Sequence, residues 1–309
     1  MKHSFRIGTR GSKLALWQAN HVRNLLSASN PELEIEIQII KTTGDAILNS
    51  PLSEIGGKGV FVKEIEEALL SENVDIAVHS MKDVPTVLPA GLIIGAVVER
   101  HDPRDAFISN TGQTLAKLSK GSRIGTGSLR RASQLLHHYP SIKIVSIRGN
   151  VDTRIRKLKE DGEFDAIVLA VAGLERMGLG EEITEIISTD IMLPAPGQGI
   201  VAIECREGDE ETANILRAIN HTETEIAAIS ERAFLYRLGG DCNVPVGCNA
   251  ILSGNTINLS GIISSPEGKL LIKKDASDSI QHAGQLGEQL AEMILEAGGN
   301  EILEQLTSS

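Results

Sequence analysis

The sequence predicts an α/β protein with two related lobes, hinge crossovers between them, and a smaller α+β domain at the C-terminal end. At 309 residues the chain is longer than one hydrophobic core usually supports, which favours two or three domains. A strand that ends at Ile7 is followed by a Gly-rich turn and a helix, and the same order follows a strand that ends at Ile124, which indicates an internal repeat. From Glu223 onward the pattern changes to a long helix, three short strands and a final helix.

The two copies of the repeat share their first motif and the order of the elements that follow. Ile7-Gly-Thr-Arg-Gly-Ser in the first copy matches Ile124-Gly-Thr-Gly-Ser in the second. Open α/β sheets bind ligands at the carboxyl ends of their strands, where helix starts favour anions. Each lobe is therefore predicted to carry an anion-binding turn, and two facing lobes would form a cleft. The predicted strands are 5–7, 35–40 and 75–80 in the first copy, and one ending at 124, 142–147 and 165–170 in the second.

Two segments are predicted to cross between the lobes and to act as a hinge. Residues 94–105 begin apolar and end charged, and residues 186–199 contain two prolines before a strand at 200–204 that would return to the first lobe. The predicted boundaries are 1–98 with 199–218 for lobe one, 99–198 for lobe two, and 219–309 for the C-terminal domain. The elements of that last domain are a helix at 223–238, strands at 248–252, 256–263 and 270–274, and a helix at 280–297.

A stretch from Arg123 to Lys159 holds nine lysines and arginines against one acid, although the whole chain has a net charge of -11. Concentrated cations repel each other, so such a stretch usually surrounds something anionic. Arg130 and Arg131 lie in the first turn of the helix predicted at 129–138, where cations oppose the helix dipole. We therefore expect them to bind a ligand rather than to stabilise the helix; a solvated basic face is the alternative.

Further cations follow the ends of predicted strands. Arg148 comes directly after the second strand of the second copy, Arg154 about two turns further on, and Arg176 after the third strand. The planar guanidinium group binds carboxylates and phosphates through two hydrogen bonds. Lys58 stands between two glycines at the end of a polar segment, 41–59, that could fold over a cleft; a plain helix-entry lysine is equally compatible with this position.

Polar residues also gather after the buried-looking strand at 76–78. The run HSMKD, residues 79–83, is followed by a proline at 85, a pattern typical of the rim of an active site. A carboxylate in a cation-lined cleft stays ionised, so Asp83 is a candidate for stabilising a developing positive charge. The alternative is an aspartate that caps a turn.

Composition argues against several classes of protein. The acidic net charge and the single Trp disfavour nucleic-acid binding. No apolar run reaches the length of a membrane span, and the N-terminus lacks the apolar core of a signal peptide. Three cysteines without a CxxC pair or a histidine at metal spacing favour a reduced cytoplasm and predict no metal site. Cys242 lies in a Gly-rich loop, where buried packing and reactivity are both compatible with the pattern.

Seven motifs, found from the first lobe to the C-terminal domain, carry a resemblance to a known family. By these motifs the chain resembles the porphobilinogen deaminase family of tetrapyrrole biosynthesis, and the joint occurrence of HSMKD, GSLRR and the GGDC loop is highly specific. The motifs, in their order along the chain, are IGTRGSKLALWQA, GGKGVFVKEIE, DIAVHSMKDVP, GTGSLRR, IRGNVDTR, LPAPGQG and GGDCNVPVG.

The resemblance implies lobes like those of periplasmic binding proteins, in a monomeric enzyme that joins four porphobilinogen molecules head to tail into hydroxymethylbilane. Ammonia would leave at each step. The resemblance also implies a dipyrromethane cofactor joined by a thioether to Cys242, with Asp83 as the catalytic carboxylate. The cofactor contacts that it implies are Lys82, Ser128, Arg130, Arg131 and Arg154, and the substrate contacts are Arg10, Ser12, Arg148 and Arg176, to which we add Lys58.

Two other functions would use some of the same features. A non-enzymatic binder of organic anions would have the same lobes and hinge, because a fold does not determine a function. Such a binder would not need Asp83 among cations or the loop around Cys242. A cysteine-dependent transferase or hydrolase would need a histidine to orient the thiol, and the nearest one in the sequence, His221, lies more than 20 residues from Cys242. We therefore expect the enzyme that the resemblance implies.

Overall fold

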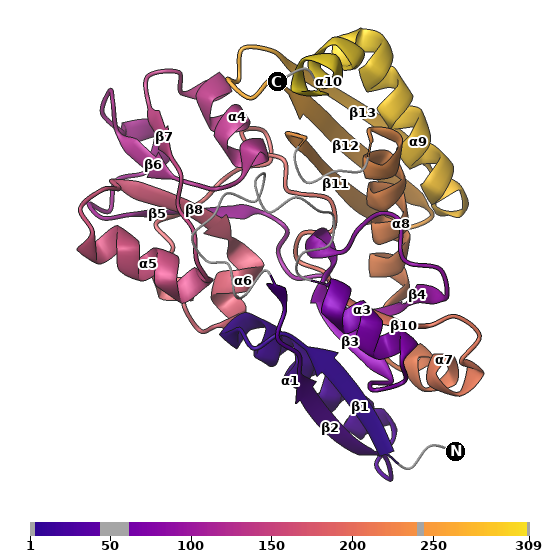
Figure 1. The fold of residues 1–309 in the computed structure, drawn as a ribbon. Coiled ribbons are helices and arrows are strands. Elements are labelled where there is room, and N and C mark those ends of the chain that lie inside the picture. The colour runs from indigo at the N-terminus through magenta and orange to yellow at the C-terminus, as the bar shows by residue number, and fades with distance from the viewer. Residues whose placement is uncertain (1–3, 44–61, 240–243, 308–309) are drawn as a thin grey trace. The chain divides into compact units, whose positions relative to one another are not determined.

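The computed structural model describes residues 4–43, 62–239 and 244–307 (Figure 1). The chain divides into two compact units. The first unit consists of Met1–His101 and Ile200–Glu225, and the second of Asp102–Gly199 and Ile226–Ser309. Each of the three predicted domains contains one of the three sheets. The predicted domain boundaries themselves stay a prediction.

The first unit is built on a five-stranded sheet with the strand order β2-β1-β3-β10-β4. β1, β2 and β3 are parallel, whereas β10 is antiparallel to both of its neighbours. The predicted return of the strand at 200–204 to the first lobe is therefore confirmed. The elements are β1 (Ser4–Thr9), α1 (Lys13–Ser29), β2 (Glu34–Ile39), α3 (Lys63–Leu70), β3 (Ile76–Ser80), η1 (Met81–Asp83), β4 (Leu92–Val97), β10 (Val201–Arg206) and α7 (Glu210–Arg217).

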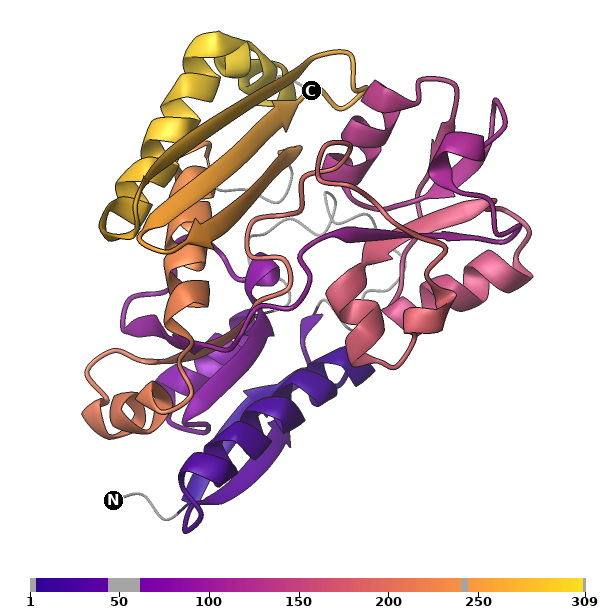
Figure 2. The ribbon, with the colours of Figure 1, turned by 180° about the vertical axis from the view of Figure 1, so that it is seen from behind.

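Helices pack on both faces of this sheet, and α1 lies in front of it in Figure 2. Along β3, Ile76 and Val78 pack in the cluster that contains residues of α1, whereas Ala77 packs with Ile65 and Leu69 of α3. Successive side chains of a strand point to opposite faces, so a continuous apolar run serves two helices at once.

The second unit repeats this topology. Its five-stranded sheet has the order β7-β6-β8-β5-β9, so that β5 and β9 occupy the places of β10 and β4. β6, β7 and β8 are parallel, and β5 is antiparallel to both neighbours, which confirms the predicted repeat. The elements are β5 (Asp105–Ser109), η2 (Leu115–Lys117), β6 (Arg123–Gly125), α4 (Leu129–His138), β7 (Lys143–Val145), α5 (Val151–Glu160), β8 (Ala166–Ala170), α6 (Val171–Arg176), η3 (Gly180–Glu182) and β9 (Glu185–Ile186).

The same kind of side-chain hydrogen bond occurs once within each lobe. Asp75, just before β3, accepts from the backbone N–H of Arg6 at 2.8 Å, and Asp165, just before β8, accepts from that of Arg123 at 2.7 Å. This backbone hydrogen bond is the main reason why the pKa of Asp165 lies below its ordinary value. In both lobes a carboxylate thus ties the third strand of the repeat to the first.

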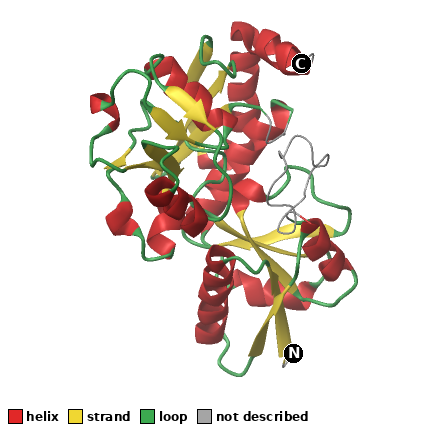
Figure 3. Ribbon diagram, turned by 60° about the vertical axis from the view of Figure 1, so that its left-hand side comes forward, coloured by secondary structure: helices red, strands yellow, loops and turns green. Residues whose placement is uncertain are grey.

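The C-terminal part of the second unit is a three-stranded antiparallel sheet in the order β11-β12-β13, packed against helices (Figure 3). Phe234 of α8 and Leu290 of α9 belong to its core. A Cβ at Gly261 of β12 would lie 2.6 Å from the Phe234 ring, so glycine is required for this close approach. The elements are α8 (Thr222–Arg237), β11 (Val246–Ser253), β12 (Thr256–Ser264), β13 (Leu271–Ser279), η4 (Ile280–His282), α9 (Ala283–Ile294), η5 (Leu295–Gly299) and α10 (Asn300–Thr307).

One predicted element has to be shortened, and another ends as expected. The segment 94–105, expected to be a crossover, contains the end of β4 and the start of β5, because its apolar half pairs with β10. The connection is therefore limited to 98–104. The last helix, expected at 280–297, is found as η4, α9 and the start of η5; the interruption at Gly298, whose φ of 107° is not helical, lies beyond the expected end, and α10 follows.

Candidate functional site

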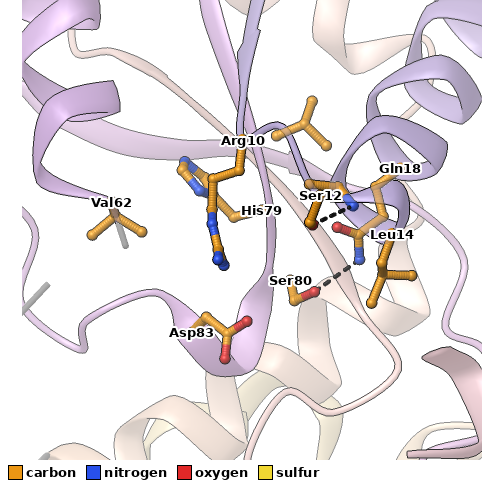
Figure 4. Close-up of a pocket in the computed structure, with 10 residues that line it drawn as sticks. Arg10, Ser12, Leu14, Gln18, Val62, His79, Ser80 and Asp83 are labelled. Atoms are coloured by element: carbon orange, nitrogen blue, oxygen red, sulfur yellow. Dashed lines mark hydrogen bonds between the residues drawn. The ribbon is translucent and has the colours of Figure 1, made fainter. Parts of the chain in front are cut away.

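A pocket in the first unit lies where β1 and β3 end (Figure 4). These strands are parallel neighbours, so their carboxyl ends lie at the same edge of the sheet, where open α/β sheets bind ligands. The turn after β1 and the start of α1 contribute one group of lining residues, and the end of β3 with η1 contributes another. The lining residues are Arg10, Ser12, Leu14, Ala15, Gln18, Val62, Val78, His79, Ser80 and Asp83.

Asp83 lies on η1, directly after β3, and its side chain is exposed. The side chain of Arg10 extends from the end of β1 toward it (Figure 4). η1 is held in place because the backbone N–H of Met81 donates to the carbonyl of Ile200 at 3.0 Å, and that of Val84 donates to the carbonyl of Met81 at 3.1 Å. A fixed, solvent-facing carboxylate of this kind can stabilise a positive charge that develops on a ligand.

Ser12 performs a structural task at the opposite wall of the pocket. It is the N-cap of α1, and its Oγ accepts from the backbone N–H of Ala15 at 3.2 Å. Two residues on the pocket wall are also joined, because Nε2 of Gln18 donates to Oγ of Ser80 at 2.8 Å (Figure 4). These bonds fix the start of α1 against the end of β3 and give the pocket a defined shape.

In the second unit, Arg130 and Arg131 are only 5% and 6% exposed. Both pair with Asp105: Nη1 of Arg130 lies 2.7 Å from one carboxylate oxygen, and Nη2 of Arg131 lies 2.8 Å from the other. Arg130 also donates to the backbone carbonyl of Leu193, and Arg131 to that of Val168. The first turn of α4 is therefore anchored in the protein by a buried group of one acid and two bases.

Asp105 is an anion among these cations that the sequence analysis did not find. Burial alone would raise the pKa of Asp105, but the charges of Arg130 and Arg131, with hydrogen bonds from Arg130 and Gln198, hold it well below its ordinary value. Asp105 thus balances part of the positive charge of the cation-rich stretch 123–159 inside the protein. That the same two arginines contact a cofactor stays a prediction.

The Gly-rich turn of the second lobe lies against the end of its neighbouring strand. A Cβ at Gly127 would be 3.1 Å from the carbonyl oxygen of Ile147, the residue before Arg148. Ser128 follows the turn as the N-cap of α4, and its Oγ accepts from the backbone N–H of Arg131 at 3.4 Å. The structure therefore brings the turn and the half-buried Arg148 together at one edge of the sheet.

Two further predicted cations donate to backbone carbonyls. Nε of Arg154 donates to Gly149 at 2.7 Å, and Nη2 of Arg176 donates to Gly199 at 2.7 Å. Burial lowers the pKa of Arg176 to about 10, although the charge of Glu175 opposes this shift. A guanidinium with this pKa is still cationic at neutral pH, so Arg176 is a buried positive charge.

The predicted site residues are divided between the two units. Those in the first unit are Arg10, Ser12, Lys82 and Asp83, and those in the second are Ser128, Arg130, Arg131, Arg148, Arg154 and Arg176. Lys58 and Cys242 lie outside the described residues. That both groups line one cleft stays a prediction.

Sequence analysis missed the buried acids, and Asp105 and Glu204 are the two that matter most for the site. Asp105 opens the apolar run DAFIS, and Glu204 lies in the apolar run IVAIE. An acid inside an otherwise apolar strand was the available signal, because a buried carboxylate needs a partner. The partner of Glu204 is His79, whose Nε2 lies 3.1 Å from Oε2 of Glu204. His79 belongs to the HSMKD run, in which the sequence motifs indicate roles for Lys82 and Asp83.

The described part of the chain contains no helix that is both long enough and apolar enough to span a membrane. It also contains no group of three or more His, Cys, Asp or Glu side chains arranged to hold a metal ion.

The chain matches two family models. Residues 5–214 match the model described as porphobilinogen deaminase, dipyromethane cofactor binding domain, and residues 226–296 match porphobilinogen deaminase, C-terminal domain. Among solved structures, the methionine-binding protein MetQ aligns with a TM-score of 0.46 and 14% identity over 72% of this chain and 92% of that one. At that level of likeness, the fold class rests on the sheet topology described above.

Curated relatives are similar over almost the whole chain. The porphobilinogen deaminase of Syntrophotalea carbinolica is 48% identical, with 97% of this chain and 95% of that protein covered. Those of Trichlorobacter lovleyi and Geobacter sulfurreducens are each 50% identical, and the alignments cover 97% and 96% of this chain and 95% and 93% of those proteins. The chain therefore belongs to the porphobilinogen deaminase family.

Proposed function

We propose that this chain joins four porphobilinogen molecules head to tail, with loss of ammonia, into hydroxymethylbilane. We further propose that the dipyrromethane primer is held by a thioether to Cys242. The match to the cofactor-binding domain of the family supports this reading. The observation that carries it is the pocket at the strand ends, where Asp83 lies with the guanidinium of Arg10 extending toward it. A plain anion binder would not need that carboxylate.

The charges of the described residues suit a substrate and a cofactor whose pyrrole rings carry acetate and propionate groups. Arg10 in the first unit follows β1, Arg148 in the second follows β7, and Arg154 lies in the first turn of α5. Guanidinium forks bind carboxylates through two hydrogen bonds and so fix the orientation of a ring. When bound, the cofactor supplies the ring carbon to which the first substrate is joined.

Asp83 is the proposed catalytic carboxylate. Loss of ammonia leaves the methylene carbon of the substrate cationic, and the pyrrole nitrogen shares that charge. The carboxylate stabilises the charge until the free α-carbon of the terminal ring of the growing chain attacks. That attacking ring then loses the proton of its α-carbon, and a nearby base assists the transfer. Because Asp83 is exposed at the pocket rim, it can serve this role without a large desolvation cost.

We also propose that the protein acts as a cytoplasmic monomer. The odd number of three cysteines, with no CxxC pair, supports a reducing compartment. The monomeric state is supported by the family resemblance.

The function is tested by incubating the purified protein with porphobilinogen and measuring released ammonia and bilane. Asp83→Asn is expected to lower kcat by about 10²-fold or more, because it removes the charge that stabilises the cationic carbon. The thermal unfolding of this variant is expected to match that of the wild type, since Asp83 is exposed.

The matched control is Glu67→Gln, an exposed carboxylate of the same unit that should keep full activity. A wild-type protein that binds porphobilinogen without releasing ammonia would favour the anion binder. Near-normal turnover by Asp83→Asn would contradict the role given to this carboxylate.

A further inference from the structure

Three ionisable side chains meet in the core of the first unit, behind the pocket. We call them the His79 cluster: His79 of β3, Glu204 of β10 and Glu66 of α3. β3 and β10 are antiparallel neighbours, and their register places His79 beside Ala202 and Ala77 beside Glu204, so His79 and Glu204 point to the same face. That face is the one on which α3 packs with Ala77.

The cluster is buried more deeply than a surface ion pair. Glu204 is 0% exposed, His79 5% and Glu66 7%. Nε2 of His79 lies 3.1 Å from Oε2 of Glu204. Apart from that contact, Oε1 of Glu66, both carboxylate oxygens of Glu204 and Nε2 of His79 have no hydrogen-bond partner among the described residues. Buried polar groups that fold stability alone requires are normally satisfied, so this concentration of unsatisfied atoms calls for a functional explanation.

The cluster also reaches the pocket. His79 lines the pocket together with Ser80 and Asp83, which follow it on the same segment of chain. Figure 4 shows the imidazole of His79 beside the base of the Arg10 side chain, on the pocket wall above Asp83. One end of the cluster therefore contacts the space in which the proposed reaction takes place, and the other end is enclosed in protein.

Ionising both Glu66 and Glu204 costs free energy, because two buried negative charges lie close together. Burial raises the pKa of Glu66 to about 7, the charge of Glu204 adds to the shift, and the charge of His79 opposes it. In the described part of the chain, Glu66 is the carboxyl group whose pKa is raised. With Glu66 uncharged, an imidazolium that forms at His79 when it accepts a proton would be balanced by the charge of Glu204.

Other charged groups face the cluster from the elements packed around it. Arg10 and Asp83 lie on the pocket side. At the opposite end of the same face, Nη2 of Arg206 lies 2.9 Å from Asp209 and 3.7 Å from Asp75, so its charge is already balanced. On α3, Lys63 and Glu67 are exposed and pair with each other. Among the described residues, the buried charge of the cluster is thus set by its own three members.

We propose that His79 accepts the proton that the condensation releases in the Asp83 pocket, that Glu204 holds the resulting imidazolium, and that Glu66 acts as an uncharged carboxylic acid beside this pair. This inference rests on the proposed function. The proton leaves the α-carbon of the attacking ring, the electron pair of the broken C–H bond restores the aromaticity of that ring, and the proton binds to a ring nitrogen of His79. His79 later returns it to the released ammonia or to water, so no oxidant or further reactant is needed.

The protonation of the cluster is tested without substrate, by a difference infrared titration of the C=O stretch of carboxylic acids across the neutral pH range. The wild type is expected to show a band that disappears with a midpoint near pH 7, in line with the value for Glu66. Glu66→Gln should remove the band, and the control Glu67→Gln should retain it. Glu204→Gln should move the midpoint down, and His79→Gln should move it up, because the two neighbours act with opposite signs.

Absence of a titrating band in the wild type would overturn the proposal, and so would its persistence in Glu66→Gln. The wild-type titration needs no substitution, so a variant that fails to fold does not remove the test.

The role of His79 is tested by the pH profile of condensation. His79→Gln is expected to lower kcat by about 10²-fold with little change in KM, and to remove one ionisation from the profile. Glu204→Gln should lose the same ionisation, and the double variant should be no slower than the slower single one, because groups that act together are non-additive. A His79→Gln enzyme with normal kcat and an unchanged profile would contradict the proposal. A wild type without condensation activity would instead contradict the proposed function, and the infrared titration would still decide the state of the cluster.

Discussion

Ser12 and Ser128 occupy equivalent places in the two lobes, and each is the N-cap of the helix that follows a Gly-rich turn. In each case the hydroxyl oxygen already accepts one of the backbone N–H groups that would otherwise be available to an anion. The capacity of these turns to bind carboxylates therefore depends more on the arginines around them than on the helix starts. A substitution of Arg148 therefore tests whether these arginines bind carboxylates.

Arg148→His is expected to impair primer assembly or elongation by about tenfold or more, because imidazole is shorter and lacks the fork that binds a carboxylate. Intact mass after expression reports assembly, and single-turnover kinetics with porphobilinogen report elongation. The matched control is Arg156→His, in the same cation-rich stretch, where an exposed pair with Glu160 at 3.3 Å contributes little to stability. If both variants assembled the primer and elongated the chain equally well, Arg148 would not belong to the site.

At the scale of elements, the buried group around Asp105 holds three segments together. Asp105 begins β5, Arg130 and Arg131 begin α4, and Gln198, in the segment before β10, donates to the same carboxylate at 3.0 Å. The ion pairs thus join the start of α4 to the start of β5. Removing the acid would leave two buried cations without their counterion, which is costly.

Asp105→Asn is expected to lower the free energy of unfolding by about 3–5 kcal/mol in urea titrations. Asp165→Asn is the control, because its side chain is 41% exposed and an amide oxygen can still accept from Arg123. Since the pKa of Asp105 is lower in the folded than in the unfolded chain, its contribution is complete above about pH 4 and is lost as the pH falls through the folded value. A loss no larger than that of Asp165→Asn would contradict this account.

Elements with a local signal were predicted well, and those that depend on distant partners were not. The helix at 129–138 is found as α4 with the same limits, because its N-cap and apolar spacing lie within a few residues. β9 has two residues and pairs with β5, far away in the sequence, so no local pattern marks it. The partnership of Asp105 with Arg130 and that of His79 with Glu204 join distant residues in the same way.

In the whole molecule, the repeated sheet topology places predicted site residues in each of the two units. Each lobe contributes a turn, a capped helix and cations at the same edge of its sheet, so the motifs that predicted the family also predicted where the charges lie. The family models and relatives extend over both units, which ties the cofactor-binding region and the C-terminal region to one enzyme. The proposed link between them is Cys242.

The most direct measurement is the intact mass of the purified wild-type protein beside Cys242→Ser and Cys248→Ala. Cys248 is a buried core thiol of the C-terminal sheet, so its substitution controls for the loss of any cysteine from that region. We expect the wild type and Cys248→Ala to be heavier than their bare chains by a two-pyrrole adduct, and Cys242→Ser to have the mass of its bare chain. An adduct that persists in Cys242→Ser, or a wild type that stays at the mass of the bare chain after incubation with porphobilinogen, would contradict the account.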